Sequence, residues 1–256
     1  VFTASLIVII ATSTLAEYFF GATYQLLLNA DQKSYVQTSL QIIATILNTV
    51  CCIVIMHIGA HSDHQLGKIT GFAIDKGIHM AYGPKMNGVV EISSLQFPKR
   101  AQWHVAMTPP EKQGDWADHL RGATIALSNR YPLRVGLCAV LDGELPIGGL
   151  SSSAAVIITF LSALCELNGI TLSANELIEI SKEAENRYVG VACGKLDQSC
   201  EVYCRKDHLL YMDMLDDSYE LIPISPLAKP FEIAIFFSGL ERSLAGSKFN
   251  MRVDEC

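Results

Sequence analysis

The pattern of apolar and polar positions changes near residue 58, and from Gly59 onward it predicts a folded protein of mixed helices and strands. Three segments carry apolar residues at helical spacing: residues 116–128, 154–168 and 173–187. Gly169 predicts the end of the second helix, because glycine readily adopts the left-handed conformation found after a helix. Ser173 and Glu176 form a capping-box sequence at the start of the third helix.

Short apolar runs bounded by turn residues predict strands between these helices. The expected strands are residues 69–73, 77–82, 88–93, 134–141, 201–213, 220–223 and 231–237. We expect the first two to flank a turn at 75–77, and the third to pair with the second across 85–88. The chain shows no internal repeat and no low-complexity segment.

The first 57 residues have a different character. Only Glu17, Asp31 and Lys33 are charged among the first sixty residues. The apolar stretches 1–28 and roughly 40–58 are each long enough to span a hydrocarbon core of about 30 Å. No basic region precedes the first stretch, so a signal peptide is not indicated. Three interpretations follow: a membrane hairpin, a buried helical hairpin, or a segment foreign to the domain.

Charge and cysteine content narrow the function classes. The net charge of −7 and the absence of a basic stripe exclude a nucleic-acid partner. The eight cysteines contain no Cys-x-x-Cys pair, which is typical of reduced, buried thiols in a cytosolic protein.

The run at residues 146–155 is the strongest local signal for chemistry. It reads Pro-Ile-Gly-Gly-Leu-Ser-Ser-Ser-Ala-Ala and leads directly into the predicted helix 154–168. Free backbone N–H groups and the positive end of a helix suit a phosphate, and glycines permit close approach. It is not a Walker A loop, because no Gly-Lys-Ser/Thr follows. The alternative is a serine-capped helix after an ordinary turn.

Two other polar clusters are candidates for a site. The first gathers His61, Asp63 and His64 in a turn that follows His57. Imidazole and carboxylate groups suit zinc, but the spacing matches no common zinc signature, and binding of sugar hydroxyls is the favoured use. The second cluster is the glycine-led segment 194–199 with its acid, Asp197.

These segments together, and in this order, resemble the GHMP kinase superfamily and, within it, the galactokinases. The matching segments read Gly59-Ala60-His61-Ser62-Asp63-His64, then 146–154, then 185–198 from Glu185 to Gln198. Residues 237–240 and 250–256 are similar to the family's next block, so the resemblance covers about 58–256.

The resemblance implies an α+β fold: a GHMP kinase N-terminal domain of the two-layer ribosomal protein S5 domain 2-like type over residues 58–205. Residues 206–256 would then begin a truncated ferredoxin-like C-terminal region. It also implies an ATP-dependent sugar 1-kinase that uses Mg²⁺ and acts on a small sugar or uronic acid in the cytoplasm. We expect a monomer or weak homodimer, and no membrane partner, because charges that would fix a membrane orientation are nearly absent.

Each candidate residue takes its role from this resemblance. The ATP-binding loop would comprise Pro146, Gly148, Gly149, Leu150, Ser151, Ser152, Ser153 and Ala154. Ser153 and Glu185 would hold Mg²⁺, and Asp197 would be the catalytic carboxylate facing the anomeric hydroxyl, acting as general base or orienting that hydroxyl. The sugar would contact Ala60, His61, Asp63, Gly194, Asp197 and Phe249.

Departures from the galactokinase pattern sharpen the expectation. The loop is one residue shorter, and its extra glycine still allows phosphate to approach. Ala60 stands where galactokinases have a Glu beside the sugar C6 hydroxyl. That Glu would repel a C6 carboxylate by about 1 to 4 kcal/mol at 4 Å. The segment around Ala60 is also similar to galacturonokinases, so we expect a uronic-acid or related sugar 1-kinase.

The region before His61 differs most from the galactokinase pattern. The family places a catalytic Arg seven residues before the His of this signature, where this chain has Val54. The match also begins only near residue 58, which favours the interpretation of 1–57 as foreign to the domain. The chain stops before the family's third, glycine-rich motif, so we expect an incomplete enzyme. The alternative function is a catalytically silent sensor that binds sugar and ATP.

Overall fold

The computed structural model describes residues 63, 66–144, 150–225, 227 and 250. Backbone contacts divide the chain into residues 1–58 and 59–256, and every described residue belongs to the second unit. The expectations for residues 1–57 and for a strand at 231–237 lie outside the described residues. No helix in the described part is both long and apolar enough to cross a bilayer.

A four-stranded sheet with strand order β2-β5-β3-β4 forms one layer of the fold. Its strands are β2 (Ile78–Lys85), β3 (Val89–Ser94), β4 (Ala101–His104) and β5 (Gly136–Gly143). Strand β5 lies between β2 and β3, antiparallel to the first and parallel to the second. The expected β2–β3 hairpin is therefore wrong, because β5, more than 40 residues later in the chain, takes the edge of β3 that a hairpin would have used.

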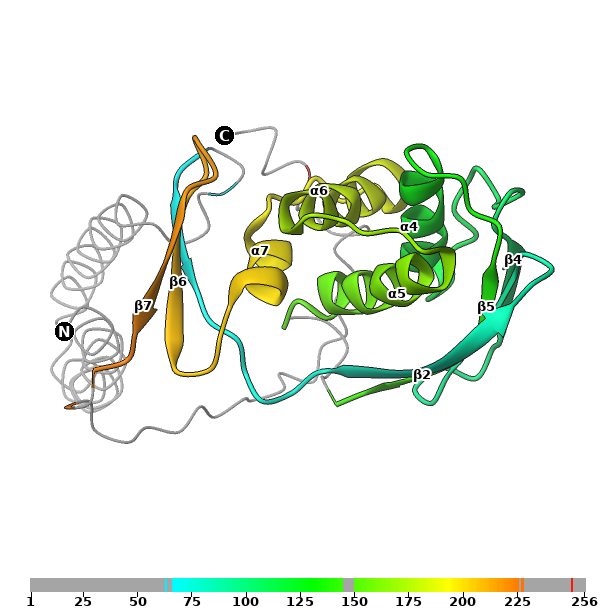
Figure 1. The fold of residues 1–256 in the computed structure, drawn as a ribbon, viewed down its shortest axis with the longest axis horizontal. Helices are drawn as coiled ribbons and strands as arrows, with labels where there is room; N and C mark the ends of the chain where they lie inside the picture. Colours follow the sequence, from blue (N-terminus) through cyan, green and yellow to red (C-terminus); the bar gives the residue numbers. More distant parts are fainter. Residues whose placement is uncertain (1–62, 64–65, 145–149, 226, 228–249, 251–256) are drawn as a thin grey trace, which may run out of the picture. The chain divides into compact units, whose positions relative to one another are not determined.

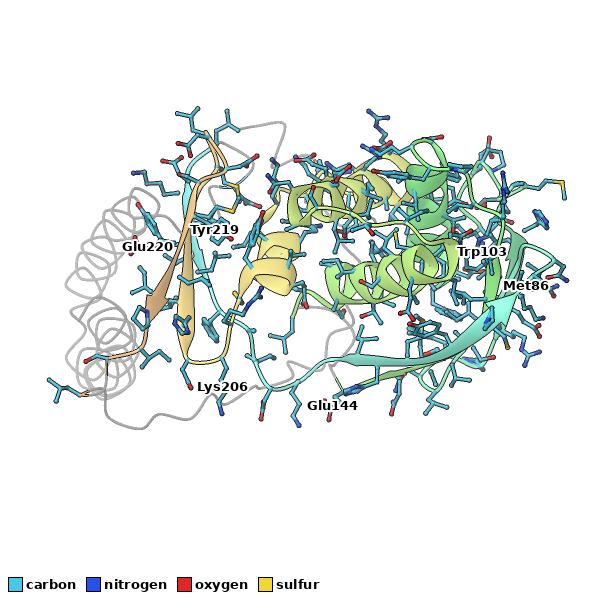
Figure 2. All side chains as sticks on the ribbon, in the orientation of Figure 1. Met86, Trp103, Glu144, Lys206, Tyr219 and Glu220 are labelled. Carbon is cyan, nitrogen blue, oxygen red and sulfur yellow. The ribbon has the colours of Figure 1, made fainter. Side chains whose placement is uncertain are left out.

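Three helices make the second layer: α4 (Asp118–Ser128), α5 (Ser152–Asn168) and α6 (Ala174–Glu183). Figure 1 shows α4 and α5 lying against the sheet, with α6 beside them. The core between the layers is apolar, and the ring of Phe160 on α5 packs against Trp103 on β4 at 6.0 Å between centroids. Figure 2 labels Trp103 at this inner side of β4.

A second, three-stranded antiparallel sheet has the order β1-β6-β7. Its strands are β1 (Lys68–Gly71), β6 (His208–Asp213) and β7 (Tyr219–Pro223), and α7 (Leu196–Tyr203) packs against β1 (Figure 1). A separate apolar cluster lies beneath this sheet. The ring of Tyr203 stacks on Tyr219, which Figure 2 labels on β7, at 4.1 Å between centroids.

Strand pairing corrects a second expectation. β1 and β2 do not form a hairpin around residues 75–77, because β1 pairs with β6 and β2 pairs with β5 in different sheets. The segment between β1 and β2 connects the two sheets. Its turn residues indicate a local turn, but they do not indicate which distant strand pairs with β1 or with β2.

The structure also corrects two element boundaries. Residues 196–203 form helix α7, so the expected strand 201–213 begins only at His208. The expected helix 173–187 is α-helical only to Glu183 and continues as a π-helix, η3 (Ala184–Val189). Strand β4 is an element that the sequence pattern did not predict.

The other helix signals are confirmed. Ser173 and Glu176 exchange both hydrogen bonds of a capping box, and Gly169 ends α5 in the left-handed conformation with φ 64°. The mixed α+β fold expected from the sequence is therefore confirmed.

Candidate functional site

The serine-rich run forms the start of helix α5. Ser151 adopts a left-handed backbone with φ 55°, which turns the chain sharply just before the first helical residue. Ser151, Ser152 and Ser153 are half-buried, whereas Ala154 is fully buried and anchors the turn in the core. The first turn holds no acidic residue, so its free N–H groups and helix dipole favour an anion. Pro146, Gly148 and Gly149 lie outside the described residues, and Leu150 immediately precedes the turn.

Glu185 is a buried carboxylate in the π-helix η3, with 4% of its surface exposed. The Gln198 side-chain amide donates to its Oε2 atom at 2.5 Å, and the Cys193 thiol reaches the same atom at 3.5 Å. Burial raises the pKa of Glu185, and the nearby charge of Asp197 raises it further. The Ser153 hydroxyl acts in the opposite direction, since it lies close enough to favour the charged carboxylate.

The structure thus brings together Ser153 and Glu185, the two residues expected to hold Mg²⁺. No group of three His, Cys, Asp or Glu side chains suited to a metal occurs within the described part of the chain. Mg²⁺ needs fewer protein ligands than that, because it retains several waters and phosphate oxygens. Glu185 is a buried carboxylate beside the Ser153 hydroxyl, and it has no cationic partner among the described residues. This arrangement fits such an ion.

Asp197 lies in the first turn of α7 and is half-buried. Its charge raises the pKa of Glu185, so the two carboxyl groups are close enough to interact. The expected catalytic residue is therefore near the expected metal ligands. The backbone N–H of Leu196, at the start of the same helix, donates to Asp63 at 3.0 Å, a contact between residues 133 positions apart. This bond ties Asp63 to the helix that carries Asp197.

Asp63 also lies directly against Gly194. A Cβ atom at Gly194 would come within 1.9 Å of the Asp63 carboxylate, so only glycine permits this approach. A cavity of about 250 Å³ opens beside the pair. Its lining includes Asp63, Lys182, Asn186, Cys193, Gly194 and Lys195. The structure therefore brings two of the expected sugar-binding residues together, while Ala60, His61 and Phe249 lie outside the described residues.

Three polar side chains around this site were not assigned roles from the sequence. Gln198 contacts Glu185, Asn186 exchanges hydrogen bonds with the backbone of Cys193, and Asn250 bonds to both Gly190 and Ala192. Gln198 lies next to Asp197 in the chain, which is the signal that could have identified it. Asn186 and Asn250 order the 190–193 segment, and no local pattern indicates that contact.

Helix α4 holds the π-helix in place at a close crossing. Gly122 lies so near η3 that a Cβ atom would meet the carbonyl oxygen of Ala184 and the Cβ of Tyr188, each at 2.9 Å. The Tyr188 hydroxyl donates to the carbonyl oxygens of Pro109 and Glu111. The position of Glu185 therefore depends on packing against an element about 60 residues earlier in the chain.

Comparison with known proteins identifies the family. Residues 117–205 match the model of the GHMP kinases N-terminal domain. A galacturonokinase of Arabidopsis thaliana is 37% identical over 219 residues, and a galactokinase of Thermosipho africanus is 30% identical over 213 residues. Each match covers 78% of this chain, and 52% and 54% of the two relatives, so the chain spans about half the length of the curated relatives it matches.

Solved structures agree at the level of the fold. The galactokinase of Lactococcus lactis, complexed with galactose, matches with a TM-score of 0.68 and 24% identity over 77% of this chain and 51% of that one. The domain match shows that residues 117–205 belong to the GHMP kinases N-terminal domain family, and the chain is similar to galacturonokinases and galactokinases.

Proposed function

We propose that this protein transfers the terminal phosphoryl group of ATP to the anomeric hydroxyl of a hexose or hexuronic acid, with galacturonate preferred over galactose. One observation carries the proposal: the Ser153 hydroxyl on α5 and the Asp197 carboxylate on α7 both act on the buried Glu185 carboxyl group of η3. The similarity to galacturonokinases and galactokinases supports the same reaction.

The start of α5 would bind the phosphates of ATP. Its N–H groups and dipole supply positive potential, and the turn at Ser151 exposes those groups. Phosphoryl transfer depends mostly on positioning and on charge stabilisation rather than on covalent chemistry by the protein. A rigid helix end anchored in the core by Ala154 meets that requirement.

Ser153 and Glu185 would hold Mg²⁺ with the phosphates. When bound, Mg²⁺ neutralises charge on the phosphate oxygens. Burial of Glu185 keeps water from competing for its carboxylate, and the amide of Gln198 favours its charged form through a hydrogen bond.

Asp197 would accept or orient the proton of the sugar's anomeric hydroxyl. In the transfer, the hydroxyl oxygen forms a bond to the γ-phosphorus while the bond from that phosphorus to the ADP oxygen breaks. The hydroxyl proton passes to Asp197 and then to solvent. The half-buried position of Asp197 in the first turn of α7 leaves it accessible to a small substrate.

Asp63 and Gly194 would contact the sugar, since both line the cavity of about 250 Å³. Galacturonate is preferred in this proposal because Ala60 replaces a Glu found in galactokinases. A carboxylate at that position would repel the substrate's own carboxylate by about 1 to 4 kcal/mol at 4 Å.

Steady-state kinetics with galacturonate and galactose test the proposal, with ADP formation and sugar 1-phosphate measured together. We expect a higher kcat/KM for galacturonate. Ala60→Glu should lower the value for galacturonate by about 5- to 1000-fold, which corresponds to the same 1 to 4 kcal/mol. A clear preference of the unmodified protein for galactose would reject the uronic-acid part of the proposal and leave the kinase part standing.

A second candidate function is a sensor that binds sugar and ATP without turnover. Val54 favours it, because no cationic side chain stands at the position of the family's catalytic Arg. Binding of galacturonate and of a nonhydrolysable ATP analogue, with no sugar phosphate formed, would identify the sensor. Val54→Arg is then expected to introduce measurable phosphorylation.

We further propose that the protein acts in the cytoplasm as a monomer or weak homodimer. The described cysteines are all free thiols, as expected for a reducing compartment. Analytical ultracentrifugation checks the oligomeric state, and cell fractionation checks the location.

A further inference from the structure

We propose that Gln198 is a positioning residue that orients the Glu185 carboxylate toward the bound cation. The inference rests on the proposed function, because it assigns Gln198 a role at the same magnesium site. Gln198 is distinct from the phosphate-binding turn on α5 and from Asp197.

The contact is short and fully enclosed. Gln198 is completely buried, and its Nε2 atom donates to Glu185 Oε2 at 2.5 Å. The same nitrogen lies 3.7 Å from the Cys193 sulfur. Both Gln198 and the Cys193 thiol meet the carboxylate at Oε2. Two contacts at one oxygen restrict rotation of the carboxylate and define the direction of its other oxygen.

The hydrogen bond also joins two elements of the site. Gln198 belongs to α7 and follows Asp197 directly, whereas Glu185 belongs to the π-helix η3. A shift of α7 would therefore move Asp197 and Gln198 together. The hydrogen bond from Gln198 couples the position of Glu185 on η3 to the position of α7.

Packing alone does not account for a glutamine at this position. Its carbonyl oxygen, Oε1, is buried and has no hydrogen-bond partner among the described residues. An unpaired buried acceptor lowers stability, and a methionine would fill the same length without that cost. The amide orientation follows from the contact with Glu185, since turning it round would place two oxygens against each other.

Direct cation binding tests the inference. Mn²⁺, a paramagnetic substitute for Mg²⁺, is titrated into the full chain with a nonhydrolysable ATP analogue, and free Mn²⁺ is measured by electron paramagnetic resonance. Gln198→Met should weaken Mn²⁺ binding about 10- to 100-fold, the usual effect of removing a group that orients a metal ligand. Galacturonate affinity, measured by calorimetry, should change less than about twofold if the role is limited to orientation.

Ser199→Ala is the matched control. Ser199 is the next residue on α7, is equally buried, and its hydroxyl has no partner among the described residues. This variant should leave Mn²⁺ affinity unchanged. Gln198→Asn provides a second variant should Gln198→Met not fold, because it keeps an amide that is too short to reach Glu185. It should also weaken Mn²⁺ binding.

Unchanged Mn²⁺ affinity in a folded Gln198 variant overturns the inference. Equal losses of Mn²⁺ and galacturonate binding also overturn it, because they indicate a general structural role. Failure of the proposed function gives a different result: the unmodified protein binds Mn²⁺ with the nucleotide but phosphorylates no sugar. In that case the loss of Mn²⁺ binding in Gln198→Met still supports the positioning role.

Discussion

Glu185 is proposed to bind the cation, and burial of its charged carboxylate lowers the stability of the ligand-free protein. Burial raises its pKa, and the charge of Asp197 acts in the same direction. A carboxyl group whose pKa is raised by folding contributes stability below its unfolded value of 4.5 and loses that contribution as the pH rises through the folded value. Once the side chain is ionised it therefore destabilises the ligand-free protein, and a bound cation would offset that cost.

Glu185→Gln should consequently raise the melting temperature of the ligand-free protein at pH 7 to 8. The difference from the unmodified protein should shrink as the pH falls toward 4.5, where the unmodified carboxyl group is increasingly protonated. Differential scanning calorimetry across this pH range measures both effects. Mn²⁺ binding should be lost in the same variant. A lower melting temperature than the unmodified protein at pH 8 would contradict this account.

Asp197→Asn tests the catalytic assignment. Loss of the proton acceptor should lower kcat by about 100- to 10,000-fold, the usual contribution of a general base. Galacturonate binding should persist, because an amide can still hydrogen-bond the hydroxyl. Asp75→Asn, at an exposed position outside the site, serves as the control and should leave kcat unchanged. Kinetics and calorimetry on the same samples separate the two effects, and a near-normal kcat in Asp197→Asn would reject the assignment.

Among the elements, the crossing of α4 and η3 has the greatest consequence for the site. π-Helical turns are rare and occur frequently at functional sites, and η3 carries Glu185. The close approach at Gly122 allows η3 to pack directly on α4. The capping box at Ser173 then begins α6, which runs directly into η3.

Gly122→Ala should be destabilising, although alanine in a helix interior usually gains up to about 1 kcal/mol over glycine. The new Cβ would meet backbone and Cβ atoms at 2.9 Å, and overpacking of this kind costs about 1 to 3 kcal/mol. Urea denaturation measures the stability, and Mn²⁺ titration measures the displacement of Glu185. Gly77→Ala is the control, since nothing lies within 4 Å of its added Cβ. Equal stabilities of the two variants would show that η3 can move away freely.

At the scale of the whole unit, the site depends on contacts between distant parts of the chain. Asp63 accepts a hydrogen bond from Leu196, 133 residues later, and lies against Gly194. The two sheets have separate apolar clusters, and α7 contacts α5 and α6 as well as β1. Binding at this site should therefore stabilise more than one element.

Galacturonate at about 100 times its Kd should raise the free energy of unfolding by about 2.7 kcal/mol, provided that it binds the native state alone. Asp63→Ala should lose this stabilisation at the same concentration, because it removes a proposed sugar contact and the bond to α7. Urea denaturation with and without the sugar provides the measurement. The same increase in Asp63→Ala would place the sugar elsewhere.

Local signals in the sequence determined the elements that depend on nearby residues. The helix starts and stops at Ser173 and Gly169 follow from hydrogen bonds and backbone angles within a few positions, so the pattern predicted them correctly. The order of the motifs also made the serine-rich turn, Glu185 and Asp197 candidates for the site, and their roles stay predictions.

Only the tertiary structure decided which segments meet. The placement of β5 between β2 and β3, the π-helical turn at Glu185 and the contact between Gln198 and Glu185 all depend on atoms distant in the sequence. Periodicity records which face of an element is apolar, but it does not identify the partner of that face. The sequence by itself therefore determined the candidate chemistry, whereas packing determined the burial and orientation of the groups that would perform it.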